Sequence, residues 1–139
     1  MNRLKNLVSL MLNKKIQNKT DLRDEINIIL NNHSLKNSLI ESQLIISHSA
    51  KKLNYLDVKT DEIDIQKIKK ILEERLKGKP LSKIIKQKGF WKDIFYTDEN
   101  TLDPRSESEV MIESIINDFN DQKDTQFYFI DLCCGTGCL

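Results

Sequence analysis

The sequence has no long apolar run and few of the residues that define specialised folds. No stretch approaches the roughly 18 consecutive apolar residues that span a bilayer. The N-terminal residues also lack the continuous apolar core and small-residue cleavage site of a secretory signal. Aromatic residues are only 6% of the 139 residues. The three cysteines, Cys133, Cys134 and Cys138, are too close together for a disulfide framework, which predicts a reduced, cytoplasmic protein with no membrane partner.

The sequence also has no excess of positive or of negative charge. The 22 basic and 21 acidic residues give a net charge of +1, and this balance does not indicate a nucleic-acid partner. The distribution is uneven, because residues 77–92 hold six lysines and no acid, whereas residues 93–131 hold eleven acids. This change of sign predicts a boundary between two units. The lysine stretch suits either an RNA or phosphate contact or a solvated surface, and the lack of interleaved aromatic residues favours the surface.

Apolar periodicity predicts a series of short helices from the start of the sequence to residue 85. The first covers residues 3–15. Thr20 or Asp21 can cap the second, Ser34 a third that runs to about residue 52, and Thr60 or Asp61 a fourth that stops at residue 78. A short helix follows over residues 80–85. The apolar residues assigned to the second, third and fourth helices are Leu22, Ile26, Ile29 and Leu30; Leu35, Leu39, Ile40, Leu44, Ile45 and Ile46; and Ile65, Ile68, Leu72 and Leu76. Short helices with short connections predict a small antiparallel bundle.

The period changes after residue 88. Aromatic and branched residues at 90–91 and 94–96 flank Lys92 and Asp93, which predicts a β-hairpin. Asp103 or Ser106 can cap a further helix. Its apolar side would hold Val110, Met111, Ile115 and Phe119. A buried strand is predicted over residues 127–132, so that helix, strand and glycine loop form the opening of an α/β unit.

An acidic residue and a glycine turn follow this predicted strand, in the sequence Asp-Leu-Cys-Cys-Gly-Thr-Gly at residues 131–137. Ligands of open α/β sheets bind at the carboxyl ends of the strands, where glycine lets the backbone approach them closely. A strand-to-helix turn without a ligand is the alternative interpretation. The cysteines have neither a Cys-x-x-Cys pair nor a nearby histidine, so no metal site is expected.

This loop resembles the first motif of S-adenosylmethionine-dependent methyltransferases, acid-x-Gly-x-Gly-x-Gly, with Cys133 in place of the first glycine. A more specific resemblance lies upstream, in residues 78–109. That segment is similar to the glutamine methyltransferases of peptide chain release factors, the PrmC/HemK family. The residues that keep the family's register are Gly78, Pro80, Phe90, Trp91, Leu102, Pro104, Arg105 and Glu109. The departures are Lys86 for a usual glycine, Gly89 for a glutamate, Asp103 for an apolar residue, Ser106 for a proline and Ser108 for a threonine.

The resemblance implies an architecture and an activity. The expected fold is an N-terminal α-helical bundle over residues 1–86, a β-hairpin linker over residues 87–104, and the start of a Rossmann-like α/β methyltransferase domain over residues 105–139. The family transfers a methyl group from S-adenosylmethionine to the glutamine amide nitrogen of class I release factors. The cofactor-binding residues by resemblance are Asp131, Cys133, Cys134, Gly135, Thr136 and Gly137.

The family's Asn-Pro-Pro-Tyr motif, which holds the substrate amide, does not occur in the sequence, so no catalytic residue is assigned. We therefore expect an inactive fragment in which cofactor binding is weak or absent. A stand-alone helical module that binds a protein without catalysis is the alternative. A methyltransferase acting on nucleic-acid adenine fits less well, because of the Pro-Arg segment and the balanced charge.

Overall fold

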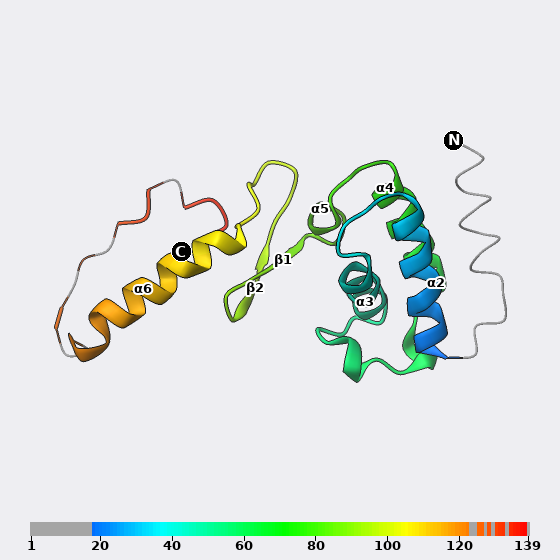
Figure 1. The fold of residues 1–139 in the computed structure, drawn as a ribbon, viewed down its shortest axis with the longest axis horizontal. Helices are drawn as coiled ribbons and strands as arrows, with labels where there is room; N and C mark the ends of the chain where they lie inside the picture. Colours follow the sequence, from blue (N-terminus) through cyan, green and yellow to red (C-terminus); the bar gives the residue numbers. More distant parts are fainter. Residues whose placement is uncertain (1–17, 123–124, 127, 129, 133, 139) are drawn as a thin grey trace. The chain divides into compact units, whose positions relative to one another are not determined.

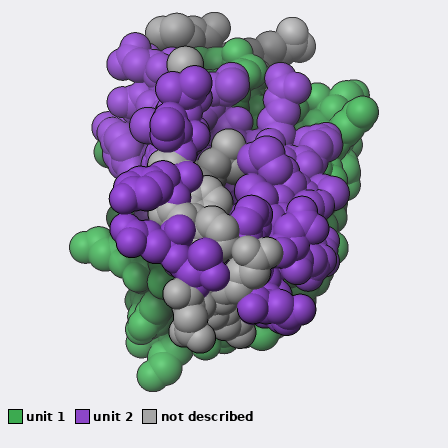
Figure 2. Space-filling model, turned by 90° about the vertical axis from the view of Figure 1, so that its left-hand side faces the viewer, with its two compact units in different colours: residues 1–85 green, residues 86–139 purple. Residues whose placement is uncertain are grey.

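The computed structural model describes residues 18–122, 125, 126, 128, 130–132 and 134–138. The chain divides into two compact units, residues 1–85 and residues 86–139, which Figure 2 colours green and purple. Helices make up most of the described structure, and a two-stranded sheet is the first element of the second unit (Figure 1). Among the described residues, no helix has the length and apolar character needed to cross a membrane. The predicted helix over residues 3–15 lies outside the described part of the chain.

Helix α2 (Lys19–Asn32) begins one residue after its cap, Asn18. The Asn18 side chain accepts hydrogen bonds from the backbone N–H groups of Thr20 and Asp21, both at 2.9 Å. The predicted caps, Thr20 or Asp21, were wrong, because these residues already donate from inside the first turn, where the orphan N–H groups of a helix lie. The predicted buried face is confirmed: Leu22, Ile26, Ile29 and Leu30 are at most 1% exposed.

Helix α3 (Ser38–Ser49) starts later than predicted. Ser34 does not cap it, because Ser34 has a φ of +57° and lies in the turn after α2. Asn37 (φ +59°) is the residue that precedes α3. Non-glycine residues seldom adopt this left-handed region except as single residues in turns. Two such residues so close together therefore reverse the chain between α2 and α3.

The two faces of α3 differ from the single apolar stripe that the sequence suggested. Ile45 and Ile46 are fully buried, as expected. The rest of the buried face is made of small hydroxyl residues, Ser38, Ser42, Ser47 and Ser49. Leu39, Ile40 and Leu44 are instead exposed, by 47%, 59% and 42% of their surface. Helix α3 is therefore apolar on both its inward and its outward side.

Two short 3-10 turns, η1 (Tyr55–Asp57) and η2 (Thr60–Glu62), connect α3 to helix α4 (Ile65–Leu76). The carboxylate of Asp64 caps α4 by accepting from the backbone N–H of Lys67 at 3.0 Å. The predicted caps, Thr60 and Asp61, were wrong because both belong to η2. Gly78 ends the region as predicted, with a φ of +96° that suits glycine.

The core of the first unit lies among α2, α3, α4 and the short helix α5 (Leu81–Ile85). Its buried apolar members are Leu22, Ile26, Ile29, Leu30, Ile45, Ile46, Val58, Ile68, Ile71, Leu72, Leu81 and Ile85. An ion pair also joins α3 to α4. Nε and Nη2 of Arg75 donate to the two oxygens of the Glu41 carboxylate, at 2.8 and 2.9 Å. Both side chains of this pair are less than one-fifth exposed. The helical bundle therefore has a continuous apolar core with a fork-shaped ion pair beside it.

Two lysine ammonium groups, from α2 and α4, donate hydrogen bonds to backbone carbonyls in and before the connection between α3 and α4. Lys19 Nζ, at the start of α2, donates to the carbonyl oxygens of Tyr55, Leu56 and Val58 at 3.2, 3.0 and 2.9 Å. Lys67 Nζ, in α4, donates to the last turn of α3 through the carbonyl of residue 48 at 2.6 Å. In η2, the Glu62 carboxylate accepts the backbone N–H of Lys59, which holds the pKa of Glu62 below its ordinary value. The irregular segment is thus held by side chains of the neighbouring helices.

The predicted hairpin is confirmed in the second unit. Strands β1 (Gln87–Phe90) and β2 (Asp93–Tyr96) pair antiparallel, with Gln87 opposite Tyr96 and Phe90 opposite Asp93. Trp91 lies in the turn and not in a strand, and its φ of +53° is the left-handed conformation that tight hairpin turns use. The rings of Phe90 and Phe95 meet edge to face, 6.3 Å apart.

After the hairpin come the 3-10 turn η3 (Ser106–Ser108), helix α6 (Glu109–Phe119) and the turn η4 (Asn120–Gln122). The predicted helix is confirmed, but neither Asp103 nor Ser106 caps it, since α6 continues from η3 without a side-chain cap. None of its residues is buried. The apolar side that the sequence pattern identified is therefore formed but largely open.

The predicted strand over residues 127–132 was wrong for the residues that the structure describes there. Tyr128, Ile130 and Leu132 have no strand conformation and are 89%, 83% and 83% exposed. A strand needs a neighbour that satisfies its backbone groups. The only pairing among the described residues is that of β1 with β2. The start of a Rossmann-like sheet is therefore not present in the described part of the chain.

Candidate functional site

The hairpin turn and the start of α6 are joined by one hydrogen bond. The backbone N–H of Trp91 donates to Oε1 of Glu109 at 2.8 Å. A carboxylate that accepts a backbone N–H forms a charge-assisted bond, which is stronger than a neutral one. The bond joins two residues that are 18 positions apart in the sequence, Trp91 in the hairpin turn and Glu109 at the start of α6.

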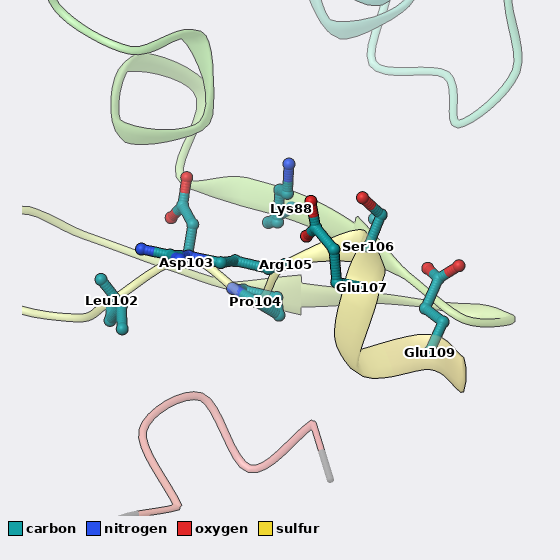
Figure 3. A pocket seen from close by; sticks show the side chains of 9 residues that line it. Lys88, Leu102, Asp103, Pro104, Arg105, Ser106, Glu107 and Glu109 are labelled. Carbon is teal, nitrogen blue, oxygen red and sulfur yellow. The ribbon is translucent and has the colours of Figure 1, made fainter. Parts of the chain in front are cut away.

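A polar pocket of about 540 Å³ lies between β1 and the segment that leads into α6. Figure 3 shows its side chains, which come from the strand, from the residues after the hairpin and from the helix start. The lining residues are Lys88, Gly89, Leu102, Asp103, Pro104, Arg105, Ser106, Glu107 and Glu109. Asp103 is fixed by the Thr97 hydroxyl, which donates to its Oδ1 at 2.8 Å. The pocket therefore combines basic and acidic side chains, and the hydrogen bond from Thr97 holds one of the acidic ones, Asp103, in place.

A second, apolar cavity in the same unit has a volume of about 570 Å³. Its walls come from the hairpin, from α6 and from the C-terminal residues, as Phe90, Trp91, Lys92, Asp93, Phe95, Met111, Ile112, Ile115, Ile116, Ile130, Asp131 and Cys138. The ammonium of Lys92 lies 5.6 Å from the centre of the Trp91 ring. The walls are mostly aromatic and aliphatic and carry two carboxylates, those of Asp93 and Asp131, and one ammonium, that of Lys92. Such a cavity suits a ligand that is mostly apolar and carries charged groups.

The predicted glycine loop forms a turn in the structure. Gly135 and Gly137 have φ values of +56° and +71°, and the N–H of Gly137 donates to the carbonyl of Cys134 at 2.8 Å. No heavy atom lies within 4 Å of the place where a side chain would begin at Gly137. The hydroxyl of Thr136 is buried and has no hydrogen-bond partner in the described structure. An open glycine turn with an unpaired hydroxyl fits a loop that passes close to a polar ligand.

The structure brings the predicted site residues together only in part. Asp131 lines the apolar cavity, whereas the turn of Cys134, Gly135, Thr136 and Gly137 is not among its lining residues. Cys133 lies outside the described residues. Within the described part of the chain, no three histidine, cysteine or acidic side chains are grouped as metal ligands would be.

Sequence reasoning missed the apolar cavity. It assigned the aromatic residues of the hairpin to strands and the apolar residues of α6 to one side of a helix, without relating the two. The signal available was the coincidence of two apolar patterns, one at 90–95 and one at 111–116, on either side of a polar segment. Periodicity within each element cannot show that two elements face the same space.

No model of a protein family matches the chain. Curated proteins do match parts of it. The release factor glutamine methyltransferase of Leptospira interrogans is 42% identical over 66 residues, which are 48% of this chain and 23% of that protein. The protein of the same name from Mycoplasma mycoides is 36% identical over 87 residues, 63% of this chain and 30% of the relative. That of Thermodesulfovibrio yellowstonii is 31% identical over 121 residues, 84% of this chain and 42% of the relative.

These relatives are all named as glutamine methyltransferases. The chain is partially homologous to the release factor glutamine methyltransferases, as its Phe-Trp and Pro-Arg segments predicted. It spans between 23% and 42% of the length of the three curated relatives.

Proposed function

We propose that this chain carries the partner-docking and cofactor-loop parts of a release factor glutamine methyltransferase. In this proposal residues 1–86 dock a class I release factor, residues 87–104 form a linker, and residues 105–139 begin the cofactor domain. The reaction of the whole enzyme is methyl transfer from S-adenosylmethionine to a glutamine amide nitrogen of the release factor. The setting is the cytoplasm, without a membrane or a direct nucleic-acid partner.

The observation that carries the proposal is the hydrogen bond between Trp91 and Glu109. Both residues keep the family's register, and they lie in two separate segments of the sequence. The bond brings the Phe-Trp pair to the start of α6, and Leu102, Pro104 and Arg105 line the polar pocket in between. Trp91, Glu109 and the Leu-Asp-Pro-Arg segment are thus brought together within the second unit, which supports the proposal that they serve one site.

The residues proposed to hold the cofactor are Asp131, the turn of residues 133–137 and the walls of the apolar cavity. S-adenosylmethionine supplies an electrophilic methyl group on a positively charged sulfur. The Asp131 carboxylate can attract that charge, and Trp91 can cover an apolar surface of the ligand. The open turn at Gly137 lets backbone N–H groups approach polar atoms.

We propose further that the 139-residue protein catalyses no methyl transfer by itself and binds the cofactor weakly or not at all. Catalysis of this kind depends on the precise orientation of a poorly nucleophilic amide, which requires positioned acceptors. The Asn-Pro-Pro-Tyr motif that does this in the family is not in the sequence. Asp131 is exposed, and its described neighbours, Ile130 and Leu132, are not in a strand that would fix its position.

The experiment combines a binding and an activity measurement on the purified 139-residue protein. Calorimetry with a class I release factor tests the partner, and transfer of labelled methyl to that release factor tests turnover. We expect binding and no transfer above the background without protein. Turnover would overturn the proposed inactivity, and a lack of release-factor binding would overturn the proposed docking role.

A stand-alone binding module is the second candidate, and the position of the core favours it. All residues of the main core cluster lie between Leu22 and Ile85, so the first unit buries its own apolar face. The lysine-rich stretch would supply the contact in this case. Replacing Lys86 and Lys88 with glutamate would then abolish binding of the release factor, whereas unchanged binding would exclude the lysine stretch.

A further inference from the structure

Trp91 has a backbone conformation that is unusual for a bulky residue. Phe90 pairs with Asp93, so the hairpin loop has only two residues, the first of which is Trp91. Its φ of +53° is a left-handed value that glycine or asparagine usually supplies in such loops. Conformations of this kind persist where the surroundings hold them, and they gather at ligand sites. A tryptophan in this loop therefore indicates a role for its side chain and a group that holds its backbone.

Glu109 supplies the group that holds this backbone. Its Oε1 accepts the N–H of Trp91 at 2.8 Å. The bond is charge-assisted, so it is stronger than a bond between two neutral groups. Glu109 is also the first residue of α6, a position at which an acidic side chain is favourable for the helix. The carboxylate therefore ties the hairpin loop to the start of a regular helix.

The side chain of Trp91 is part of the wall of the apolar cavity. It is 39% exposed, so the ring is neither a core residue nor free in solvent. The ammonium of Lys92 lies 5.6 Å from the centre of the ring, within the range of a cation–π contact. Helix α6 supplies a second, aliphatic part of the wall, formed by Met111, Ile112, Ile115 and Ile116. The hydrogen bond thus joins the loop that carries the aromatic wall to the helix that carries the aliphatic one.

We infer that Glu109 is a positioning residue for the apolar cavity: it holds the loop in its left-handed conformation and so keeps the indole ring of Trp91 in the wall. Glu109 is not among the residues that line this cavity, so it acts through the backbone of Trp91 and not on the ligand. Without the bond, the loop is free to leave a conformation that a bulky residue seldom adopts, and the ring leaves the wall with it. The inference rests on the proposed function only for the identity of the ligand, S-adenosylmethionine.

The test uses the fluorescence of Trp91, which is the single tryptophan of the protein and therefore reports this ring alone. Glu109→Ala and Glu109→Gln are compared in the complete 139-residue protein. Alanine removes the acceptor, whereas the amide oxygen of glutamine can still accept the N–H. Glu113→Ala is the matched control, because Glu113 is an exposed acidic residue one turn further along α6. Circular dichroism checks that each variant keeps its helices.

We expect Glu109→Ala to increase the quenching of Trp91 by acrylamide about twofold, because a ring that is 39% exposed gains accessible surface when it leaves the wall. The fluorescence anisotropy of the ring should fall at the same time. Glu109→Gln should restore both values to nearly those of the unsubstituted protein, and the control should change neither. If Glu109→Ala loses helical structure, Glu109→Asp replaces it, since it keeps the charge and shortens the reach of the carboxylate.

The other outcomes overturn the assignment. Unchanged quenching and anisotropy in Glu109→Ala would show that the ring keeps its place without the bond. An equal change in Glu109→Gln or in Glu113→Ala would show that the loss of a negative charge, and not of the acceptor, moves the ring. Calorimetry with a class I release factor tests the proposed function separately. Binding with an unmoved ring overturns only this inference, and a moved ring without binding overturns only the proposed docking role.

Discussion

Lys19 is expected to be a main stabiliser of the first unit, although it lies at the exposed start of a helix. Its ammonium donates to three carbonyl oxygens of the η1 region, and it also lies 4.9 Å from the centre of the Tyr55 ring. The hydroxyl of Tyr55 returns a bond to the carbonyl of Lys19 at 3.2 Å. Two segments separated by more than thirty residues are thus joined at one point. The informative substitution is Lys19→Met, which keeps the length of the side chain and removes the donors.

The size of the effect follows from the surroundings of each bond. The bonds to Tyr55 and Val58 are partly buried, whereas the bond to Leu56 is exposed and exchanges with water. A hydrogen bond to a charged group contributes about 1.5–3 kcal/mol when it is well shielded, and partial exposure reduces this. Counting about 1 kcal/mol for each shielded bond, we expect Lys19→Met to lower the free energy of unfolding by about 2 kcal/mol. For a unit of this size the melting temperature should fall by roughly 8–16 °C.

Urea and thermal unfolding followed by circular dichroism measure this change. Lys70→Met is the control, because Lys70 is exposed on α4 and a surface substitution of this kind changes stability by no more than about 0.5 kcal/mol. Lys19→Arg should be intermediate, since a planar guanidinium cannot direct its donors at three converging carbonyls as an ammonium can. A loss below about 0.5 kcal/mol for Lys19→Met would refute the reasoning.

Further substitutions test the ion pair between Arg75 and Glu41 and the backbone conformation of Lys86, the first residue of the second unit. Arg75→Met should lower the free energy of unfolding by about 3 kcal/mol, because it leaves the largely buried Glu41 carboxylate without its partner. The double variant Arg75→Met/Glu41→Gln should recover much of that loss; a double variant as unstable as the sum of both single variants would contradict this. Lys86→Gly should stabilise by about 0.5–1 kcal/mol, because Lys86 has a φ of +57° that glycine adopts without strain. Lys88→Gly, within strand β1, should instead destabilise, and a gain in melting temperature there would oppose the backbone explanation.

The sequence predicted the structure correctly where the apolar periodicity of an element matches the side that the fold buries. The inward residues of α2, the short helix after Pro80 and the hairpin all follow from periodicity and turn chemistry. The caps were less predictable, because Asn18 and Asp64 compete with nearby Thr and Asp residues of similar propensity, and only the backbone conformation decides among them. Helix α3 was misjudged because its pattern holds two apolar sides, and periodicity alone does not say which one the bundle covers.

The candidate site was predictable as a motif but not as an arrangement. The positive φ values of Gly135 and Gly137 follow from glycine's freedom in a turn. The strand at residues 127–132 does not form in the described residues, because strand structure depends on a partner that propensity cannot supply. The family departure at Lys86 gains a physical meaning from the structure, since the residue sits in a conformation for which glycine is the usual choice.

The buried serines of α3 have a consequence for the order in which the first unit folds. Ser42, Ser47 and Ser49 donate to the carbonyls of Leu39, Gln43 and Ile46 within the same helix, at 2.7, 2.6 and 2.7 Å. These hydroxyls form their hydrogen bonds as soon as the helix forms, so they need no acceptor from another helix. Helix α3 can therefore dock with these three hydroxyls already paired, whereas Ser38 and Glu41 gain their partners, Asn31 of α2 and Arg75 of α4, only when the helices meet. A serine-to-alanine series across α3 would then alter the rate of unfolding far less than a change at Ile45 or Ile46.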